Sequence, residues 1–196
     1  MKRQRRVVNL VGFTGSGVTS ASKYLASEYG FKRVDPLAIV SKPYPQATNS
    51  FRHYNNCQRE LLTEMPEAMT LAVMCRTGAI CIDGLLVPSH TQKLQEKLGD
   101  NFATIALDCH PELRAKRLRE DRFGPVYGIG ISAARLAEEE AEAFCGTGKL
   151  DINIPDVMAM HAERGAQLNA NRPLLSVRLQ LENALGQLGF DLTHPR

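Results

Sequence analysis

The chain has 196 residues, 43% of them hydrophobic, which is enough to bury one large core without disulfides or structural metals. Its 24 basic and 21 acidic side chains give a formal net charge of +3, too small an excess to indicate nucleic acid as a partner. The five cysteines and five histidines lack the spacing of zinc ligands. We therefore expect one domain with reduced cysteines and no zinc-type site.

The chain starts with a basic stretch over residues 2 to 6, ahead of the first apolar run. Two interpretations stay open for residues 1 to 6: a solubilising end, or an arm that contacts a polyanion. The apolar run that follows is interrupted by Asn9 and by glycines, which is typical neither of a signal peptide nor of a membrane span. We expect a cytoplasmic protein without a membrane partner.

The first part of the chain alternates apolar runs with helical periodicity. Residues 7 to 13 predict a buried parallel strand, and the spacing of apolar residues predicts a helix over 19 to 29, ended by Gly30. A short strand is expected over 31 to 35. Three prolines within residues 36 to 50 predict a loop or an irregular insertion.

The middle of the chain continues this alternation. A helical segment is expected over 51 to 77, with an interruption near Pro66, and a buried strand over 79 to 84. A helix over 89 to 98 then leads to a strand over 102 to 108. Each of these two strands has an acidic residue at or near its end.

The last part of the chain is mostly helical. A helix over 112 to 122 carries four arginines, and a glycine-rich stretch, a helix with an acidic run and a final helix from Leu174 to Leu188 follow it. Strands that alternate with helices predict an α/β fold, with a mostly parallel sheet between two layers of helices. In such sheets ligands bind beyond the carboxyl ends of the strands.

The segment from Gly12 to Thr19 fits the phosphate-loop pattern G-x-x-x-x-G-K-[ST] at every fixed position except the lysine, which is Val18. Glycines let the backbone wrap around phosphates, whose oxygens accept bonds from N–H groups at the start of the next helix. A tight strand-to-helix connection is the alternative interpretation. The candidate phosphate-binding residues are Gly12, Gly15, Ser16, Gly17, Val18, Thr19 and Ser20.

The absence of this lysine should weaken the catalysis of phosphoryl transfer more than it weakens nucleotide binding. In phosphate loops this lysine offsets the charge that builds on the phosphates during transfer, and valine cannot do so. Lys23, one helical turn later, and Lys149, in a Gly-Thr-Gly-Lys segment, are candidate substitutes. Ordinary solvated lysines are the simpler interpretation of both.

The chain resembles the nucleotide kinases of the P-loop class, in particular the dephospho-CoA kinase-like and deoxynucleoside monophosphate kinase group. Besides the phosphate loop, the resemblance rests on residues 82 to 84, 99 to 102 and 106 to 118. It implies a three-layer P-loop NTPase fold with a helical lid, and ATP and Mg²⁺ as cofactors. It also implies an acceptor-binding helical part over about 36 to 77 and a lid region over about 112 to 150.

The resemblance assigns further roles to single residues. It makes Asp83 the acid that holds magnesium with Thr19, directly or through water, and it makes Arg117 and Arg122 catalytic lid arginines. A capping or turn role for the acids, and a solvated basic face for the arginines, stay open as alternatives. The candidate residues for binding the phosphorylated acceptor are Asp35, Arg52 and Arg59.

Two departures from the kinase pattern leave the function open. Val18 replaces the loop lysine, and Leu86 stands where relatives often carry an arginine. One hypothesis is a kinase that transfers the ATP γ-phosphoryl to a (deoxy)nucleoside monophosphate or a similar small phosphorylated acceptor. Another is a degenerate nucleotide-binding module, a pseudokinase that senses or scaffolds as a homodimer or with a partner enzyme. A third is a protein whose phosphate loop is filled by Val18 and Phe13 and binds no nucleotide.

Overall fold

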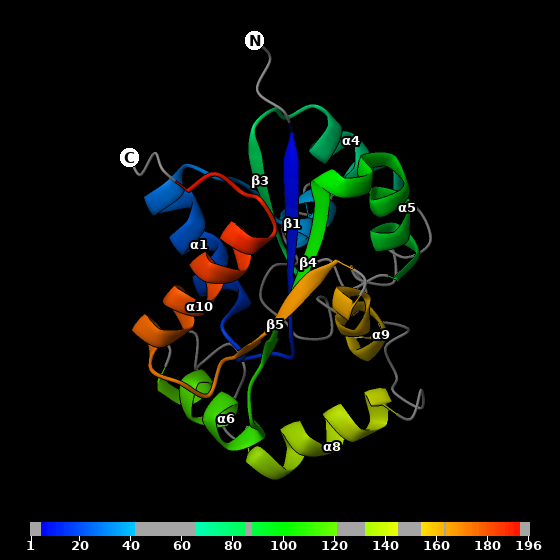
Figure 1. Ribbon diagram of the computed structural model, residues 1–196. Coiled ribbons are helices and arrows are strands. Elements are labelled where there is room, and N and C mark those ends of the chain that lie inside the picture. Colours follow the sequence, from blue (N-terminus) through cyan, green and yellow to red (C-terminus); the bar gives the residue numbers. More distant parts are fainter. Residues whose placement is uncertain are drawn as a thin grey trace.

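The computed structural model describes residues 5–41, 66–84, 88–120, 132–144, 154–162 and 164–192. Within these ranges, five parallel strands form one sheet in the order β2-β3-β1-β4-β5, and helices cover both of its faces (Figure 1). The predicted three-layer α/β fold is therefore confirmed. None of the described helices combines the length and the apolar character that a membrane crossing needs.

The sheet has β1 at its centre, between β3 and β4, with every residue from Val7 to Val11 buried. This explains its continuous apolar sequence, because a strand covered on both faces has no solvent-facing positions. The strands are β1 (Arg6–Val11), β2 (Lys32–Val34), β3 (Ala79–Asp83), β4 (Phe102–Asp108) and β5 (Gly165–Asn169).

The helices form the outer layers on the two faces of the sheet. They are α1 (Val18–Tyr29), α2 (Pro36–Ser41), α4 (Pro66–Met74), α5 (Pro88–Leu98), α6 (Pro111–Glu120), α8 (Ala133–Phe144), α9 (Ile154–Ala159) and α10 (Leu174–Gln187). Two short 3₁₀ turns, Gly99–Asn101 and Met160–Ala162, precede β4 and β5.

Successive residues of β1 supply two separate cores. Val8 and Leu10 join the cluster that α1 and α10 cover, which also contains Leu25 and Leu181. Val7 belongs to the opposite cluster, under α4 and α5. This division follows from the alternation of side chains across a strand. The central strand thus fixes both helical layers at once.

All the strands end at the same edge of the sheet because they are parallel. The chain turns there from β1 into α1 and from β4 toward α6, and α8 packs against α6 through a small cluster of Ala115, Leu118 and Leu136 (Figure 1). This edge therefore gathers the phosphate loop, the acidic end of β3 and the arginine-bearing helix α6.

The prediction of an irregular segment after Asp35 is wrong for its first six residues, which form α2. Pro36 occupies the first helical position, where its missing N–H costs nothing. The carboxylate of Asp35 caps this helix, since its Oδ1 accepts a bond of 3.3 Å from the N–H of Ala38. Residues 42 to 65 of the expected acceptor-binding part lie outside the described residues.

β5 and α9 have no counterpart among the predicted elements. In β5 only Leu168 is a buried apolar side chain, and glycine, glutamine and asparagine favour strands weakly. The strand exists because it extends the sheet alongside β4, from Thr104 opposite Gly165 to Asp108 opposite Asn169. Long-range pairing of this kind leaves no local pattern.

Truncation of a core side chain tests this packing. Leu25 is fully buried, so Leu25→Ala should lower the free energy of unfolding by about 2–5 kcal/mol through lost burial and a residual cavity. Leu175 is 69% exposed on α10, and Leu175→Ala should change it by less than about 0.5 kcal/mol. Urea unfolding followed by circular dichroism measures both values, and equal effects would contradict the assigned core.

Candidate phosphate-binding site

The loop between β1 and α1 has the backbone shape that phosphate binding needs. Gly15 and Gly17 have φ angles of 83° and 103°, which residues with a side chain rarely adopt. Gly17 caps the 12-residue helix α1, and the N–H of Ser16 donates to the carbonyl of Phe13 over 2.9 Å. The loop thus places the positive end of a helix at the ligand edge of the sheet.

Gly12 is required by close packing rather than by its dihedral angles. A Cβ atom there would lie 2.5 Å from Oγ of Ser16 and 2.8 Å from the carbonyl oxygen of Leu107 in β4. Neither distance is a permitted contact. The first glycine of the pattern therefore lets the loop lie directly on the neighbouring strand.

Ser16 carries a polar atom without a partner. Its side chain is 2% exposed, and its buried hydroxyl oxygen has no hydrogen-bond partner in the described part of the chain. Leaving such a group unsatisfied costs about 1–3 kcal/mol. Ser16 is one of the residues that line a cavity beside the loop.

The residue at the lysine position of the loop packs against the hydrophobic core. Val18 packs at the edge of the cluster under α1, and the ring of Phe13 lies 5.2 Å from the guanidinium carbon of Arg114. Neither side chain lines the cavity beside the loop. Lys23 is exposed on α1, and Lys149 lies outside the described residues.

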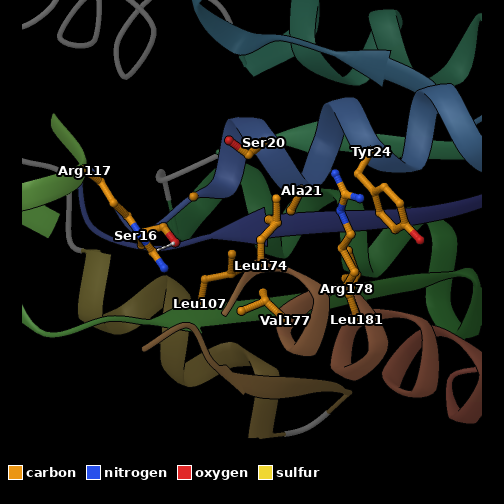
Figure 2. Close-up of a pocket in the computed structure, with 11 residues that line it drawn as sticks. Ser16, Ser20, Ala21, Tyr24, Leu107, Arg117, Leu174, Val177, Arg178 and Leu181 are labelled. Carbon is orange, nitrogen blue, oxygen red and sulfur yellow. Dashed lines mark hydrogen bonds between the residues drawn. The ribbon is translucent and has the colours of Figure 1, made fainter. Parts of the chain in front are cut away.

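A cavity of about 230 Å³ opens beside the loop, between α1 and α10 (Figure 2). Four of the predicted site residues line it: Ser16, Gly17, Ser20 and Arg117. Most of the other lining residues were not identified from the sequence. Those on α1 and α10 have the spacing of an ordinary buried helix face, which does not indicate a cavity. The missed lining residues include Tyr24, Leu174, Val177, Arg178 and Leu181.

A polar cluster fixes the far wall of this cavity. Figure 2 shows Arg178 beside the ring of Tyr24. Its guanidinium carbon lies 4.4 Å from the ring centre. The hydroxyls of Tyr24 and Tyr29 both donate to Oε1 of Glu182, the second over 2.7 Å. The hydrogen bond of Tyr24 to Glu182 raises the pKa of the Tyr24 hydroxyl, and burial raises it further. The shared carboxylate ties α1 to α10.

The two described arginines that face the loop from α6 have different roles. Arg114 is 1% exposed and braces the loop from behind, because its Nη1 donates to the Thr14 carbonyl over 3.3 Å. Arg117 donates from Nη1 to the Ser16 carbonyl over 3.2 Å and from Nη2 to the Ala170 carbonyl over 2.8 Å. Arg117 therefore brings a positive charge to the cavity side of the loop, whereas Arg122 lies outside the described residues.

Asp83 and Thr19 come together as the resemblance implies. The hydroxyl of Thr19 donates to Oδ1 of Asp83 over 3.2 Å. The other oxygen, Oδ2, accepts bonds from both Nε and Nη2 of Arg33, the first over 2.9 Å, and the Asp83 side chain is only 5% exposed. Asp83 thus already has a cationic partner, which sequence reasoning did not identify.

Arg33 is held from a second side by Asp35. Its Nη2 lies 3.1 Å from Oδ2 of Asp35, whose Oδ1 caps α2. Burial lowers the pKa of Arg33, but the hydrogen bond and the charge of Asp83 raise it above its usual range. The acceptor role of Asp35 stays a prediction, and Arg52 and Arg59 lie outside the described residues.

Kinases are found both by comparing the sequence with those of known proteins and by comparing the structure with solved structures. No protein-family model matches the chain. A shikimate kinase from Paracidovorax citrulli is 22% identical over 149 residues, covering 72% of this chain and 77% of that protein. A shikimate kinase from Bacillus cytotoxicus is 25% identical over 158 residues, covering 76% and 88%.

Solved structures agree over almost the whole chain. A gluconokinase from Sinorhizobium meliloti 1021 has a TM-score of 0.61 and 15% identity, covering 95% of both chains. A shikimate kinase from Bacteroides thetaiotaomicron has a TM-score of 0.58 and 13% identity, covering 94% of this chain and 99% of that one. A deoxyadenosine kinase from M. mycoides has a TM-score of 0.53 and 14% identity, covering 93% and 99%. The chain therefore has the fold of the P-loop kinases.

A pair of glycine substitutions tests the close packing of the loop. Gly12→Ala should lower the free energy of unfolding by about 1–3 kcal/mol, because the added carbon overlaps Ser16 and Leu107. A Cβ atom added at Gly186, near the end of α10, would meet nothing within 4 Å apart from its own helix backbone, so Gly186→Ala should stabilise the protein by up to about 1 kcal/mol. Thermal and urea unfolding measure both, and an unaffected Gly12→Ala protein would show that the loop is not fixed by this contact.

Proposed function

We propose that this chain is a nucleotide-binding protein of the P-loop kinase type, which holds the phosphates of ATP in the loop from Gly12 to Ser20. The observation that carries the proposal is the buried hydroxyl of Ser16, which has no described partner and lies in a glycine loop at a helix N-terminus, beside a cavity. A phosphate oxygen would accept its hydrogen bond and those of the loop N–H groups.

The cavity beside the loop suits one part of the nucleotide. Its volume of about 230 Å³ is below the 300–1,000 Å³ typical of sites for drug-sized ligands. Leu174 and Val177 give it apolar walls, and Tyr24 with Arg178 adds a flat polar one. We assign it to the base, with the phosphates outside it in the loop.

Phosphoryl transfer is the second candidate function, and the position of Arg117 favours it. Its guanidinium lies against the loop carbonyl of Ser16, where a cation would stabilise the charge of the transition state. In that case Asp83 and Thr19 would hold magnesium, Arg122 would add a second lid cation, and Asp35, Arg52 and Arg59 would bind the acceptor. The absence of the lysine at Val18 favours the pseudokinase instead.

The identity of the molecule that accepts the phosphoryl group is a separate part of the proposal. The likeness to dephospho-CoA and deoxynucleoside monophosphate kinases favours a small phosphorylated acceptor, bound by the part of the chain over about 36 to 77 under a lid over about 112 to 150. The relatives are named for shikimate, gluconate and deoxyadenosine. A pseudokinase would act on a partner enzyme or a second copy, and this, like the cytoplasmic location, stays a prediction.

Removal of one cation tests nucleotide binding at this site. Arg117→Gln should weaken ATP binding about tenfold or more, because a charged hydrogen-bonding group beside the phosphates is lost. Lys116→Gln is the matched control: Lys116 is exposed on the same helix, and its contact with Glu120 is a surface ion pair of 3.9 Å. Isothermal titration calorimetry measures both affinities. Absence of ATP binding to the unmodified chain at millimolar concentration would refute the proposal.

Restoring the lysine separates the kinase from the pseudokinase. In a coupled assay with ATP and shikimate, gluconate, deoxyadenosine or deoxynucleoside monophosphates, Val18→Lys should raise the transfer rate by a factor on the order of 10², as one added transition-state cation would. Val18→Met, which adds length without charge, is the control. If Val18→Lys binds ATP and stays inactive with every acceptor while the unmodified chain is also inactive, the pseudokinase interpretation is supported.

A further inference from the structure

Arg33 occupies a position that the P-loop resemblance reserves for a metal ion. Its guanidinium bonds to the Asp83 oxygen that Thr19 does not use, at the edge of the sheet beside the start of α1. The oxygen of Ser22 accepts a further bond from Nε over 3.0 Å, and Asp35 holds Nη2. Four contacts therefore fix this cation in place.

The residues at this edge do not fit a magnesium ion while Arg33 is in place. Hydroxyl and carboxylate oxygens are suitable donors for Mg²⁺. Both Asp83 oxygens, however, already have partners, and the carboxylate is 5% exposed, so an ion could bind Asp83 directly in place of Arg33 only by breaking a partly buried ion pair. Within the described ranges, no group of three or more His, Cys, Asp or Glu residues gathers to offer another site.

We propose that Arg33 is the built-in cation of this site, so that the chain binds nucleoside triphosphates without a divalent metal ion. The inference rests on the nucleotide-binding function proposed above and specifies its cation. The Arg33 side chain keeps 29% of its surface exposed, so solvent and ligands reach part of the group. Arg33 beside Asp83 and Arg117 on the cavity side of the loop are thus two side-chain cations from different elements, β2 and α6.

The first test compares ATP binding to the unmodified chain in EDTA and in MgCl₂ at equal ionic strength. Because Mg²⁺ also binds ATP itself and lowers its charge, only a gain in affinity is informative: if Arg33 already supplies the cation, the affinity in MgCl₂ should exceed that in EDTA by less than about threefold, below the 5- to 150-fold coupling typical of linked sites. Calorimetric titration measures both. A rise of about tenfold or more in MgCl₂ would overturn the proposal.

The second test removes the cation. In Arg33→Gln the carboxylates of Asp83 and Asp35 lose the positive charge of the arginine, so magnesium should now raise ATP affinity about tenfold or more. Lys32→Gln removes an equal charge from the adjacent, exposed position of β2 and should behave like the unmodified chain. Metal-independent binding by Arg33→Gln would contradict the role of Arg33.

A third measurement needs no nucleotide and separates this inference from the proposed function. Magnesium alone should raise the Tm of Arg33→Gln relative to sodium chloride of equal ionic strength, while the Tm of the unmodified chain and of Lys32→Gln should not change. If ATP binds to none of the proteins, the nucleotide-binding proposal fails and this comparison still decides whether Arg33 occupies the metal position.

The unmodified chain keeps the inference testable even if Arg33→Gln does not fold. Magnesium that raises the Tm of the unmodified chain, or its ATP affinity about tenfold, overturns the proposal. Unchanged values in both measurements support it.

Discussion

The direct contact between the phosphate loop and its neighbours is the constraint on which the site depends. Gly12 lies against Leu107 of β4, and a side chain at Gly15 would meet the backbone of Arg114 at 3.0 Å. The loop therefore packs directly against both the sheet and α6. Because Arg114 also holds the Thr14 carbonyl, strand β4 and helix α6 position the loop together.

The distribution of charge around this loop differs from the standard phosphate loop. The usual lysine extends from the loop itself, whereas here the position belongs to Val18, which packs on the core. The nearby cations come from other elements, Arg117 from α6 and Arg33 from β2, and each is held by several hydrogen bonds. Fixed side chains of this kind stabilise bound charge without reorganising, which favours tight binding of phosphates.

The sequence predicts the parts of this structure that have local signals. The loop, α1 and the buried strands follow from glycine spacing and continuous apolar runs. β5 has one buried apolar residue, Leu168, and its pairing with β4 is a long-range effect. The partners of Asp83 and the walls from α10 are also contacts between distant segments: Arg33 is 50 residues from Asp83, and Glu182 is 158 residues from Tyr24. The resemblance predicts that Asp83 belongs to the site, but it does not predict the ion pair between Asp83 and Arg33.

The pairing of Arg33 with Asp83 also distinguishes a covalently attached cation from an exchangeable one. A bound ion leaves with its ligand, responds to chelators and follows the free concentration of the metal in its surroundings. A guanidinium whose pKa lies above its usual range does none of these, since it stays charged and tethered to β2. A site built this way would keep its cation when cellular magnesium is depleted or sequestered.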